Sequence, residues 1–461
     1  MNAQIFREYD IRGIVARDLS GAVPEHIGRA YGSELRARNG ERSGLRVVVG
    51  RDNRPSSPAL AEAVIGGLRA SGVDVLDIGI VPTPVLYWAA ERLASEGGIQ
   101  ITGSHNPPEY NGIKMIMAGR ALYGAAIQGL RERIEQRRFA AGQGRLEARA
   151  VIADYIDDVA GRFTLARPVR MVVDCGNGAG SLVAVELLRR VGVEVIPLYC
   201  ESDGTFPNHH PDPTVDAFIA DMIARVRAEQ ADLGVAFDGD ADRLGAVDEN
   251  GTVVRGDILL LMFALDALAR LGPPQQLIFD VKCSQAVPEV YRAAGGEPIM
   301  WKTGHSLIKE KMKQTGAPIA GELSGHICYG ENYYGFDDAL YGACYLAALI
   351  SRLDGPFSRR VAEFPQYVST AEIRVEVSED TKFAIVDRAV DHFRREHEVI
   401  DVDGARVLFD GGWGLLRASN TQPVLVLRFE ARTAAQLERI QETMATWLAG
   451  QGIDMQAAAT H

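Results

Sequence analysis

Three aspartates alternate with small residues in the segment Asp238-Gly-Asp-Ala-Asp-Arg243, which follows a predicted strand at 233–237. Carboxylates at positions i, i+2 and i+4 of an extended chain point the same way, and they repel one another unless a cation joins them. Oxygen ligands of this kind suit Mg²⁺. A calcium EF-hand is disfavoured because its sixth position would hold Arg243 instead of glycine and because a strand, not a helix, precedes the loop. A solvated acidic turn is the alternative without a metal.

A serine stands in the turn Thr102-Gly-Ser-His-Asn-Pro107, directly after a predicted strand that ends near Ile101. The residues that follow it cannot continue a strand or a helix, so the turn presents the Ser104 hydroxyl outward. A nucleophilic serine needs a base or a cation beside it, and His105 and Lys114 are near in sequence. The segment does not resemble the nucleophile elbow of acyl-transfer enzymes. A plain Ser/Asn turn is the other interpretation.

Two later segments have the side chains to bind a sugar or a phosphate. In Gly321-Glu-Leu-Ser-Gly-His326, the side chains of Glu322 and Ser324 can bind neighbouring hydroxyls, and His326 can move protons near neutral pH. Arg417-Ala-Ser-Asn-Thr421 offers a guanidinium, hydroxyls and turn N–H groups, which together suit a phosphate. An ordinary polar turn explains each segment equally well when it is taken alone.

Smaller groups of the same kind occur elsewhere in the chain. Tyr9 and Arg12 lie close together near the N-terminus, and Lys282 and His305 each follow a predicted strand. A surface turn and a histidine with an ordinary structural role are the default interpretations here. These four residues therefore support a functional interpretation only in combination with the larger motifs.

The composition limits the classes of protein that need to be considered. The chain has 461 residues, of which 47% are hydrophobic and 24% charged, and its formal net charge is −12, which disfavours a nucleic-acid or anionic-membrane surface. We expect no signal peptide, because charged residues begin at Arg7, and no membrane span, because the longest strongly apolar run is only 258–265. A reducing cytoplasm, without a disulfide framework or a zinc site, is expected from the odd number and wide spacing of the cysteines, Cys175, Cys200, Cys283, Cys328 and Cys344.

A strand–helix–strand pattern occurs three times, and each helix ends at a glycine: Gly72, Gly192 and Gly295. The glycines lie a whole domain apart, so the repeating unit is a domain. After Pro365 the pattern changes to strands at 371–377 and beyond, with helices at 381–396 and 433–448, which predicts a smaller α+β domain with an antiparallel sheet.

The predicted fold is thus α/β: three related domains with mixed sheets and a fourth, smaller α+β domain, arranged around a central active-site cleft. The predicted domains are 1–150, with the serine turn; 151–253, with the aspartate loop; 254–366, with the Glu322 segment; and 367–461, with the Arg417 segment. Ligands of open α/β units bind at the carboxyl ends of strands, and the motifs follow predicted strands as that rule requires.

Taken together, the motifs resemble the α-D-phosphohexomutase family, most closely its bacterial phosphomannomutase/phosphoglucomutase members. The resemblance covers nearly the whole chain and rests on seven motifs in order: Y-D-I-R-G, T-x-S-H-N-P, N-G-I-K, D-G-D-x-D-R, K-T-G-H-S, G-E-x-S-G-H and R-x-S-N-T-x-P. It implies a phosphohexomutase that interconverts the 1- and 6-phosphates of mannose, and also of glucose, through a phosphoserine enzyme and a hexose 1,6-bisphosphate. A hexose 1,6-bisphosphate is the activator that the resemblance implies.

The resemblance also implies roles for particular residues. Ser104 would carry the phosphoryl group, and Mg²⁺ would be held by that phosphoserine with Asp238, Asp240 and Asp242. The catalytic residues would be Ser104 with three candidates for proton transfer, His326, Lys114 and Arg12. Glu322 and Ser324 would bind the 3- and 4-hydroxyls of the sugar. The full set of implied substrate-binding residues is Tyr9, Arg12, His105, Lys114, Arg243, Lys282, His305, Glu322, Ser324, His326, Arg417, Ser419, Asn420 and Thr421.

Small sugar phosphates are the implied partners, with no nucleic acid, no membrane and no obligate protein partner. The G-E-L-S-G-H segment resembles the dual-specificity and mannose-preferring members, so glucosamine 6-phosphate is the less expected substrate. Two alternatives are a metal-dependent phosphatase that uses only the aspartates and a catalytically silent sugar-phosphate-binding protein. The first does not explain a phosphate site at Arg417, and the second would be expected to lose Ser104 or an aspartate.

Overall fold

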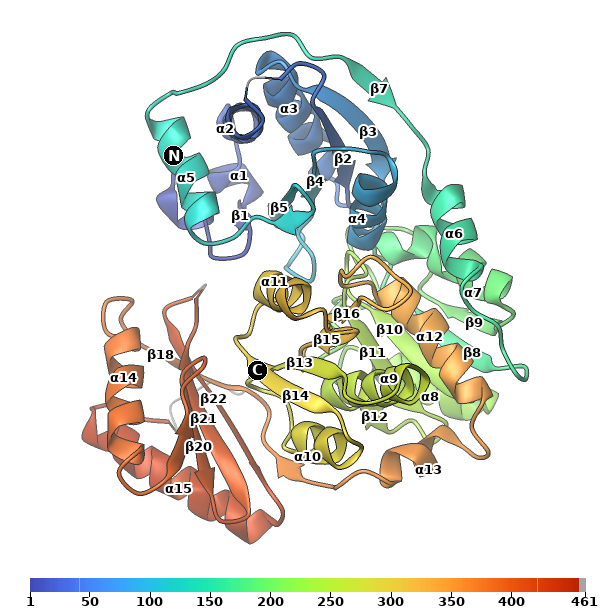
Figure 1. Ribbon diagram of the computed structural model, residues 1–461, viewed down its shortest axis with the longest axis vertical. Coiled ribbons are helices and arrows are strands. Elements are labelled where there is room, and N and C mark those ends of the chain that lie inside the picture. The colour runs from blue at the N-terminus through green and yellow to red at the C-terminus, as the bar shows by residue number, and fades with distance from the viewer. Residues whose placement is uncertain (41, 421, 456–461) are drawn as a thin grey trace.

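The computed structural model describes residues 1–40, 42–420 and 422–455, and Figure 1 shows four β-sheets with helices packed against them. In chain order the sheets have seven, five, four and six strands. Within the part of the chain that is described, none of the helices combines the length and the apolar character needed to cross a bilayer.

The first sheet has the strand order β1-β5-β4-β2-β3-β7, with β6 beside β5. It is mixed: β2 pairs in parallel with β3 and β4, and β5 is antiparallel to its neighbours. Helices α2, α3 and α5 cover one face and α4 the other. The elements are η1 Ala3–Ile5, β1 Ile11–Ile14, α1 Val15–Asp18, α2 Val23–Arg38, β2 Arg46–Arg51, α3 Ser57–Ala70, β3 Asp74–Ile80, α4 Thr83–Arg92, β4 Gly97–Ile101, β5 Tyr110–Met117, β6 Arg120–Ala121, α5 Ala125–Glu135 and β7 Leu146–Ala148.

The second sheet, β12-β11-β10-β8-β9, joins three parallel strands to two antiparallel ones. Its Gly192 closes α7 in the left-handed region, as the repeat pattern predicts. The elements are α6 Ile152–Ala160, β8 Arg170–Asp174, η2 Ala179–Leu182, α7 Ala184–Val191, β9 Glu194–Leu198, α8 Ala220–Glu229, β10 Leu233–Phe237, β11 Leu244–Asp248 and β12 Val253–Val254.

The third sheet, β14-β13-β15-β16, repeats this arrangement with one antiparallel strand, β16. The apolar run at 258–265 lies in the buried helix α9, as predicted. The elements are α9 Gly256–Leu271, β13 Gln276–Asp280, α10 Ala286–Ala293, β14 Glu297–Trp301, α11 His305–Thr315, β15 Ile319–Gly321, β16 Ile327–Tyr329, α12 Ala339–Ser351 and α13 Phe357–Ala362.

The fourth sheet, β17-β22-β21-β20-β19 with β18 beside β22, is antiparallel throughout, and α14 and α15 pack against it. The strand predicted at 371–377 is present as β18, and a further short strand, β17, precedes it and also pairs with β22. Between the two strands the Thr370 hydroxyl accepts the Phe429 N–H. The elements are β17 Val368–Ser369, β18 Ile373–Glu376, α14 Lys382–Phe393, β19 Glu398–Ile400, β20 Ala405–Phe409, β21 Gly412–Ala418, β22 Val424–Ala431 and α15 Ala434–Gly450.

The fold class predicted from the sequence, three α/β units with mixed sheets and a fourth α+β unit, is confirmed. One continuous apolar core joins α4 of the first unit to the second and third units. The fourth unit has a core of its own and meets the third through the small cluster of Val281, Trp413 and Leu415. The carboxyl ends of β4, β10, β13 and β15 carry the sequence motifs into the space between the units.

Candidate active site

Ser104 lies just beyond the carboxyl end of β4, and its side chain is buried. Its backbone adopts a φ of +49°, which is unusual for a residue other than glycine and marks a constrained turn. The hydroxyl donates to Oδ2 of Asp238 at 3.0 Å and lies 3.1 Å from Nδ1 of His105. The turn therefore directs the hydroxyl away from its strand, as predicted, but toward the aspartate loop and not toward solvent.

The Ser104 turn is held by Arg54, a fully buried residue that follows β2. Its side chain forms an ion pair with Asp52, with 3.2 Å between Nε and Oδ2, and Asp52 also accepts the Gly103 N–H. Sequence analysis gave Arg54 no role. Its guanidinium donates to four backbone carbonyls of the serine turn, at 2.5–3.1 Å: Ser104, Asn106, Pro107 and Tyr110.

Replacing Arg54 with methionine is expected to lower the free energy of unfolding by about 3–5 kcal/mol, because Asp52 and four carbonyls lose a buried partner. Arg51→Met is the matched control from the end of β2: its partly exposed ion pair with Asp77 contributes about 1 kcal/mol or less. Urea unfolding of both variants measures the difference. Equal losses of stability in the two variants would contradict this role of Arg54.

The three aspartates of the loop after β10 are fully buried, and their ligand oxygens lie within 4.8 Å of one another. The ammonium of Lys114, from β5, lies 2.7 Å from Oδ2 of Asp240 and also contacts Asp242. Thr83 donates to the same oxygen of Asp240. Among the described residues, the remaining oxygens of the pair, Oδ1 of Asp240 and Oδ1 of Asp242, have no hydrogen-bond partner.

The charges of this cluster are unbalanced. Burial, together with Asp242 and Asp240, raises the pKa of Asp238 well above its usual range. At Asp240 the effect of burial is outweighed by Lys114, which lowers the pKa. The Oδ1 atoms of Asp240 and Asp242 have no hydrogen bond from the described residues, although His326 Nδ1 lies 3.5 Å from that of Asp242. Buried carboxylate oxygens of this kind are suited to binding a cation, and Lys114 already supplies one positive charge between the carboxylates. The aspartate loop therefore fits the divalent metal that its spacing predicts.

Two histidines from the third unit lie side by side next to this loop. The rings of His305, at the start of α11, and His326, before β16, stack with centroids 5.2 Å apart. Arg243 Nε donates to His326 Nε2 at 3.0 Å. Burial lowers the pKa of His305 to about 4, so this ring is neutral at physiological pH.

Glu322 is buried in the turn between β15 and β16 and accepts the Gly304 N–H at 2.5 Å. Burial raises the pKa of this carboxyl. Ser324 lies in the same turn and is half-buried. A carboxylate and a hydroxyl two residues apart thus lie in one turn, as the G-E-L-S-G-H motif predicts.

The fourth unit contributes a second group of polar residues, opposite the aspartates. Arg417, at the end of β21, lies 3.1 Å from Asp403, and the Asn420 amide donates to the Tyr9 hydroxyl at 2.8 Å. Lys282, after β13, pairs with Glu372 at 2.7 Å. Ser419 accepts the Gln422 N–H. Thr421, the remaining residue of the segment predicted to bind a phosphate, lies outside the described residues.

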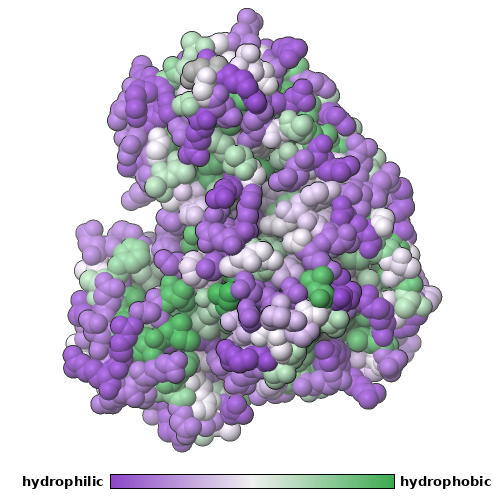
Figure 2. All heavy atoms as spheres, in the orientation of Figure 1, coloured by the Kyte–Doolittle hydropathy of each residue, from purple (hydrophilic) through white to green (hydrophobic). Residues whose placement is uncertain are grey.

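These contacts form two groups. The first group surrounds Ser104 and contains His105, Lys114, Asp238, Asp240, Asp242, Arg243, His305 and His326. The second lies where the fourth unit meets the first and third, and contains Tyr9, Lys282, Arg417 and Asn420. Arg12 is held by Asp10 at 2.5 Å. Figure 2 shows the surface hollowed at its left edge, between the first unit above and the fourth unit below.

Sequence analysis missed several residues that hold these groups. Asp337 contacts both stacked histidines, Asp52 and Arg54 hold the serine turn, and Thr83 binds an aspartate of the loop. None of them belongs to a motif whose spacing indicates chemistry. For Asp337 the sequence does carry a signal: two adjacent aspartates, Asp337 and Asp338, precede an apolar helix, and carboxylates in such a position are expected to have basic or hydrogen-bonding partners.

Comparison with known proteins agrees with the motifs and the geometry. Models of phosphoglucomutase/phosphomannomutase alpha/beta/alpha domains I, II and III match residues 3–141, 153–251 and 255–367, and the model of the C-terminal domain matches 372–446. The chain is 49% identical to a phosphomannomutase/phosphoglucomutase of Pseudomonas aeruginosa, over 95% of this chain and 94% of that protein. It is 44% identical to a phosphoglucomutase of Neisseria gonorrhoeae, over 95% of each.

Solved structures show the same relationship. A phosphoglucomutase/phosphomannomutase family protein of Burkholderia thailandensis superposes with a TM-score of 0.91 at 43% identity, covering 100% of this chain and 99% of the other. The resemblance inferred from the seven motifs is thereby confirmed. The chain belongs to the phosphoglucomutase/phosphomannomutase family and is a phosphohexomutase, an intramolecular phosphotransferase that interconverts hexose 1-phosphate and hexose 6-phosphate.

Proposed function

We propose that the substrates are the phosphates of mannose and glucose, and that the phosphoryl group passes through a phosphorylated Ser104 and a hexose 1,6-bisphosphate. The observation that carries this proposal is the 3.0 Å contact between Ser104 Oγ and Asp238 Oδ2. A phosphoryl group on that oxygen would lie against three aspartates, whose charge requires a cation. A hydroxyl held beside these carboxylates is placed for phosphoryl transfer.

Asp238, Asp240 and Asp242, with an oxygen of phosphorylated Ser104, are proposed to hold Mg²⁺. Oxygen-only donors suit this ion. When bound, it neutralises charge on the transferring group. Lys114 and Thr83 support the proposal because they bind Oδ2 of Asp240 from outside the loop, which leaves its Oδ1, without a hydrogen bond among the described residues, for the ion.

His326, Lys114 and Arg12 are the three candidates for proton transfer, and of these we propose His326 as the proton acceptor. In each half-reaction the attacking sugar hydroxyl must lose a proton, and His326 is the one imidazole among the three candidates. The cations of Lys114 and Arg12 are held by carboxylates, at 2.7 Å from Asp240 and 2.5 Å from Asp10. Their proposed contribution is to stabilise negative charge on the phosphate rather than to accept a proton.

The second group of residues is proposed to bind the part of the substrate that does not react. Glu322 and Ser324 would bind the 3- and 4-hydroxyls, a grip that accepts both glucose and mannose because these sugars differ only at C2. Arg417, Ser419, Asn420 and Thr421 would bind the phosphate that is not transferred. The other proposed substrate contacts are Tyr9, Arg12, His105, Lys114, Arg243, Lys282, His305 and His326.

The same phosphate-binding residues, those at 417–421, must bind the non-reacting phosphate of the substrate and then that of the product. The bisphosphate therefore has to reorient between the two transfers. We propose that the fourth unit opens partly to allow this. Its separate core supports the proposal. It contacts the first unit through the hydrogen bond from Asn420 to Tyr9, so an opening there would leave the contacts with the third unit, such as those of Arg406 with the Val281 and Cys283 carbonyls, in place.

Phosphorus NMR tests the reaction directly. The protein is supplied with Mg²⁺, a trace of glucose 1,6-bisphosphate as the proposed activator, and mannose 1-phosphate or glucose 1-phosphate in turn. Conversion of both sugars to their 6-phosphates is the expected result. Release of inorganic phosphate without isomerisation would instead indicate a phosphatase, and conversion of glucosamine phosphate alone would overturn the proposed substrates.

Replacing Arg417 with alanine is expected to lower kcat/KM for both sugar phosphates by about 10²-fold, since a charge-assisted bond to phosphate contributes about 1.5–3 kcal/mol. Steady-state kinetics on glucose 1-phosphate and mannose 1-phosphate measure it. The control is Arg394→Ala in the same unit, an exposed arginine paired with Asp401, which is expected to leave kcat/KM unchanged. A loss confined to one of the two sugars would contradict a phosphate contact.

Three further proposals follow from the sequence. The domains span 1–150, 151–253, 254–366 and 367–461; the protein acts in the cytoplasm; and it needs no obligate protein partner beyond its sugar phosphates. Limited proteolysis tests the boundaries, cell fractionation the compartment, and activity of the purified chain at high dilution the need for a partner.

A further inference from the structure

Cys175 and Cys200 lie at the carboxyl ends of two neighbouring strands of the second sheet. Cys175 directly follows β8, and Cys200 comes two residues after the end of β9 (Figure 1). The two strands are parallel, and the Cys175 N–H donates to the Leu198 carbonyl at 3.2 Å. The sulfur atoms are 3.2 Å apart, and both cysteines are free thiols. The fold thus brings two thiols into direct contact.

The two thiols differ in their access to solvent. Cys175 is fully buried, whereas Cys200 is only partly buried. The hydrogen bond between the sulfurs and burial together raise the pKa of Cys175 well above its usual range, and the same hydrogen bond lowers the pKa of Cys200. Because the thiolate is the reactive form of cysteine, a small oxidant from solvent reacts first with Cys200.

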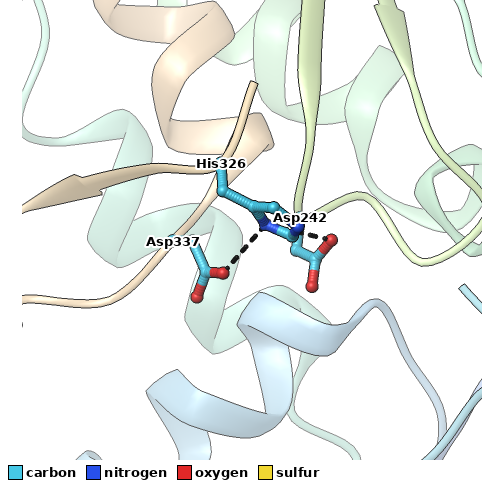
Figure 3. Close-up of side chains that lie close together, drawn as sticks. All are labelled: Asp242, His326 and Asp337. Carbon is cyan, nitrogen blue, oxygen red and sulfur yellow. Dashed lines mark ion pairs between the residues drawn. The ribbon is translucent and has the colours of Figure 1, made fainter. Parts of the chain in front are cut away.

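The other cysteines and the metal-ligand clusters limit the alternatives. Full burial separates the three remaining cysteines from solvent: Cys283, Cys328 and Cys344. Two clusters of possible metal ligands occur among the described residues, and neither contains a cysteine: the aspartate loop and the group of Asp242, His326 and Asp337 (Figure 3). Two cysteines that merely fill space in the core remain as the alternative, and that alternative predicts no bond between them on oxidation.

The loop that begins at Cys175 lies directly behind the aspartate loop. The Ala179 N–H donates to the Gly239 carbonyl at 2.9 Å. Gly178 packs so closely that a Cβ at this position would lie 2.7 Å from the same carbonyl oxygen. On its other side, Gly239 leaves no room for a Cβ beside the Ser104 carbonyl. Backbone therefore packs on backbone from the Cys175 loop through the aspartate loop to the serine turn.

The segment after Cys200 is connected to the same place by a second route. The Asn53 side chain donates to the Asn177 carbonyl at 2.7 Å and to the Ser202 hydroxyl at 2.9 Å. It thus joins both cysteine segments to the 52–54 turn, which holds the serine turn. A shift of one cysteine segment relative to the other is expected to reach the serine turn and the aspartate loop.

We propose that a peroxide oxidises Cys175 and Cys200 to a reversible disulfide, and that this bond lowers the phosphohexomutase activity. The Cys200 thiolate attacks one oxygen of hydrogen peroxide; the O–O bond breaks, a sulfenic acid forms at Cys200, and the released hydroxide takes up a proton to give water. The Cys175 sulfur then attacks the Cys200 sulfur; the S–O bond breaks, and the leaving hydroxide takes the Cys175 proton as a second water. The two thiols lose two electrons in total, and two molecules of an external thiol reverse the reaction.

The bond requires movement, because a disulfide holds its sulfurs about 2.05 Å apart and these lie 3.2 Å apart. A misplacement of about 1 Å at reacting groups costs about 10²-fold in rate, and we expect part of the movement to reach them, which lowers kcat by about 10-fold. We expect KM to stay within about 3-fold, since the proposed sugar- and phosphate-binding residues lie in the third and fourth units. The effect on kcat rests on the proposed roles of Ser104 and the aspartates, whereas the bond itself does not.

Mass spectrometry and kinetics on the same sample test the proposal. After treatment with hydrogen peroxide and digestion without a reductant, we expect linked peptides that contain Cys175 and Cys200. The kcat of the treated protein is expected to fall by about 10-fold, and dithiothreitol should restore it and separate the peptides. Dithiothreitol leaves methionine sulfoxide unchanged, so only the recovered part of the activity is assigned to thiols.

Three variants assign the effect to this pair. Cys200→Ser is expected to keep kcat within about 2-fold of wild type and to show no reversible loss with peroxide. Cys175→Ala is expected to leave Cys200 as a sulfenic acid, which dimedone labels. The matched control is Cys344→Ala in α12, a buried cysteine of the third unit that should leave the response to peroxide as in the wild-type protein.

Oxidised wild-type protein without linked peptides would overturn the proposal, as would an equal reversible loss of kcat in Cys200→Ser. If the linked protein keeps its full kcat while Ser104→Ala is inactive, the inferred effect of the bond on activity fails and the proposed function stands. If Ser104→Ala is fully active, the proposed route of the phosphoryl group fails, and the linked peptides still decide whether the disulfide forms.

Discussion

Replacing Ser104 with alanine is expected to lower kcat by about 10⁴-fold or more, as removal of a covalent nucleophile does in other enzymes. The aspartates, Lys114 and the sugar-binding turn remain in place, so substrate still binds, but no oxygen is left beside Asp238 to accept the phosphoryl group. Phosphorus NMR of glucose 1-phosphate with a trace of glucose 1,6-bisphosphate measures the loss. Labelled bisphosphate should transfer its phosphate to the wild-type protein and not to the variant.

Ser95→Ala is the control for this experiment. Ser95 precedes β4, at the end opposite Ser104, and its hydroxyl contacts only the backbone carbonyls of Ala90 and Gly97 among the described residues. Its kcat is expected to stay within about 2-fold of wild type. Isomerisation by Ser104→Ala at the wild-type rate would show that the phosphoryl group travels by another route.

The elements that carry Ser104 and the aspartates could be predicted because their chemistry and their position are both local. Each motif follows a short apolar strand, and parallel strands bring their carboxyl ends to one edge of a sheet. The spacing of Asp238, Asp240 and Asp242 alone indicates a cation, and the buried Oδ1 atoms of Asp240 and Asp242, which have no hydrogen bond from the described residues, agree with it. Local sequence patterns were therefore sufficient to predict the fold class and the main candidate reacting groups.

The residues that hold these groups could not be predicted, because their partners are distant in sequence. Arg54 binds carbonyls of the serine turn, and carbonyls carry no side-chain signature at all. Asp337 contacts His305, His326 and Lys309 only after β16 and α11 have packed together. Spacing within one segment carries no information about such contacts, so supporting residues are found only in the folded chain.

Lys114 illustrates the same limit within a recognised motif. The resemblance places it among residues that manage protons or bind substrate. In the folded protein its ammonium is buried between Asp240 and Asp242, and the two carboxylates, which outweigh the effect of burial, raise its pKa well above the usual range. A lysine held in this way is a fixed positive charge, which makes proton acceptance by Lys114 the weaker assignment.

The excess negative charge of the three buried aspartates leads to the second large expected effect on activity. Asp240→Asn is expected to lower kcat by about 10³-fold, since it removes a charge from the proposed Mg²⁺ ligands and weakens the contacts of Lys114 and Thr83. Treatment of the wild-type protein with a chelator should lower activity to a similar extent, and added Mg²⁺ should restore it. Steady-state kinetics with and without chelator measure both effects.

Thermal unfolding distinguishes loss of the ion from loss of the chemistry. An ion that binds only the folded chain stabilises it by about 2.7 kcal/mol at a concentration 100 times its dissociation constant. We expect Mg²⁺ to raise the melting temperature of the wild-type protein and to have little effect on Asp240→Asn.

The control is Asp248→Asn at the end of β11, whose carboxylate accepts the backbone N–H groups of Asn250 and Thr252 and, among the described residues, forms no hydrogen bond or ion pair with an aspartate of the loop. This variant should keep the wild-type response to Mg²⁺, because asparagine retains the accepting oxygen. A melting temperature insensitive to Mg²⁺ in all three proteins, with activity unaffected by chelator, would show that the aspartates hold Ser104 and Lys114 by charge alone.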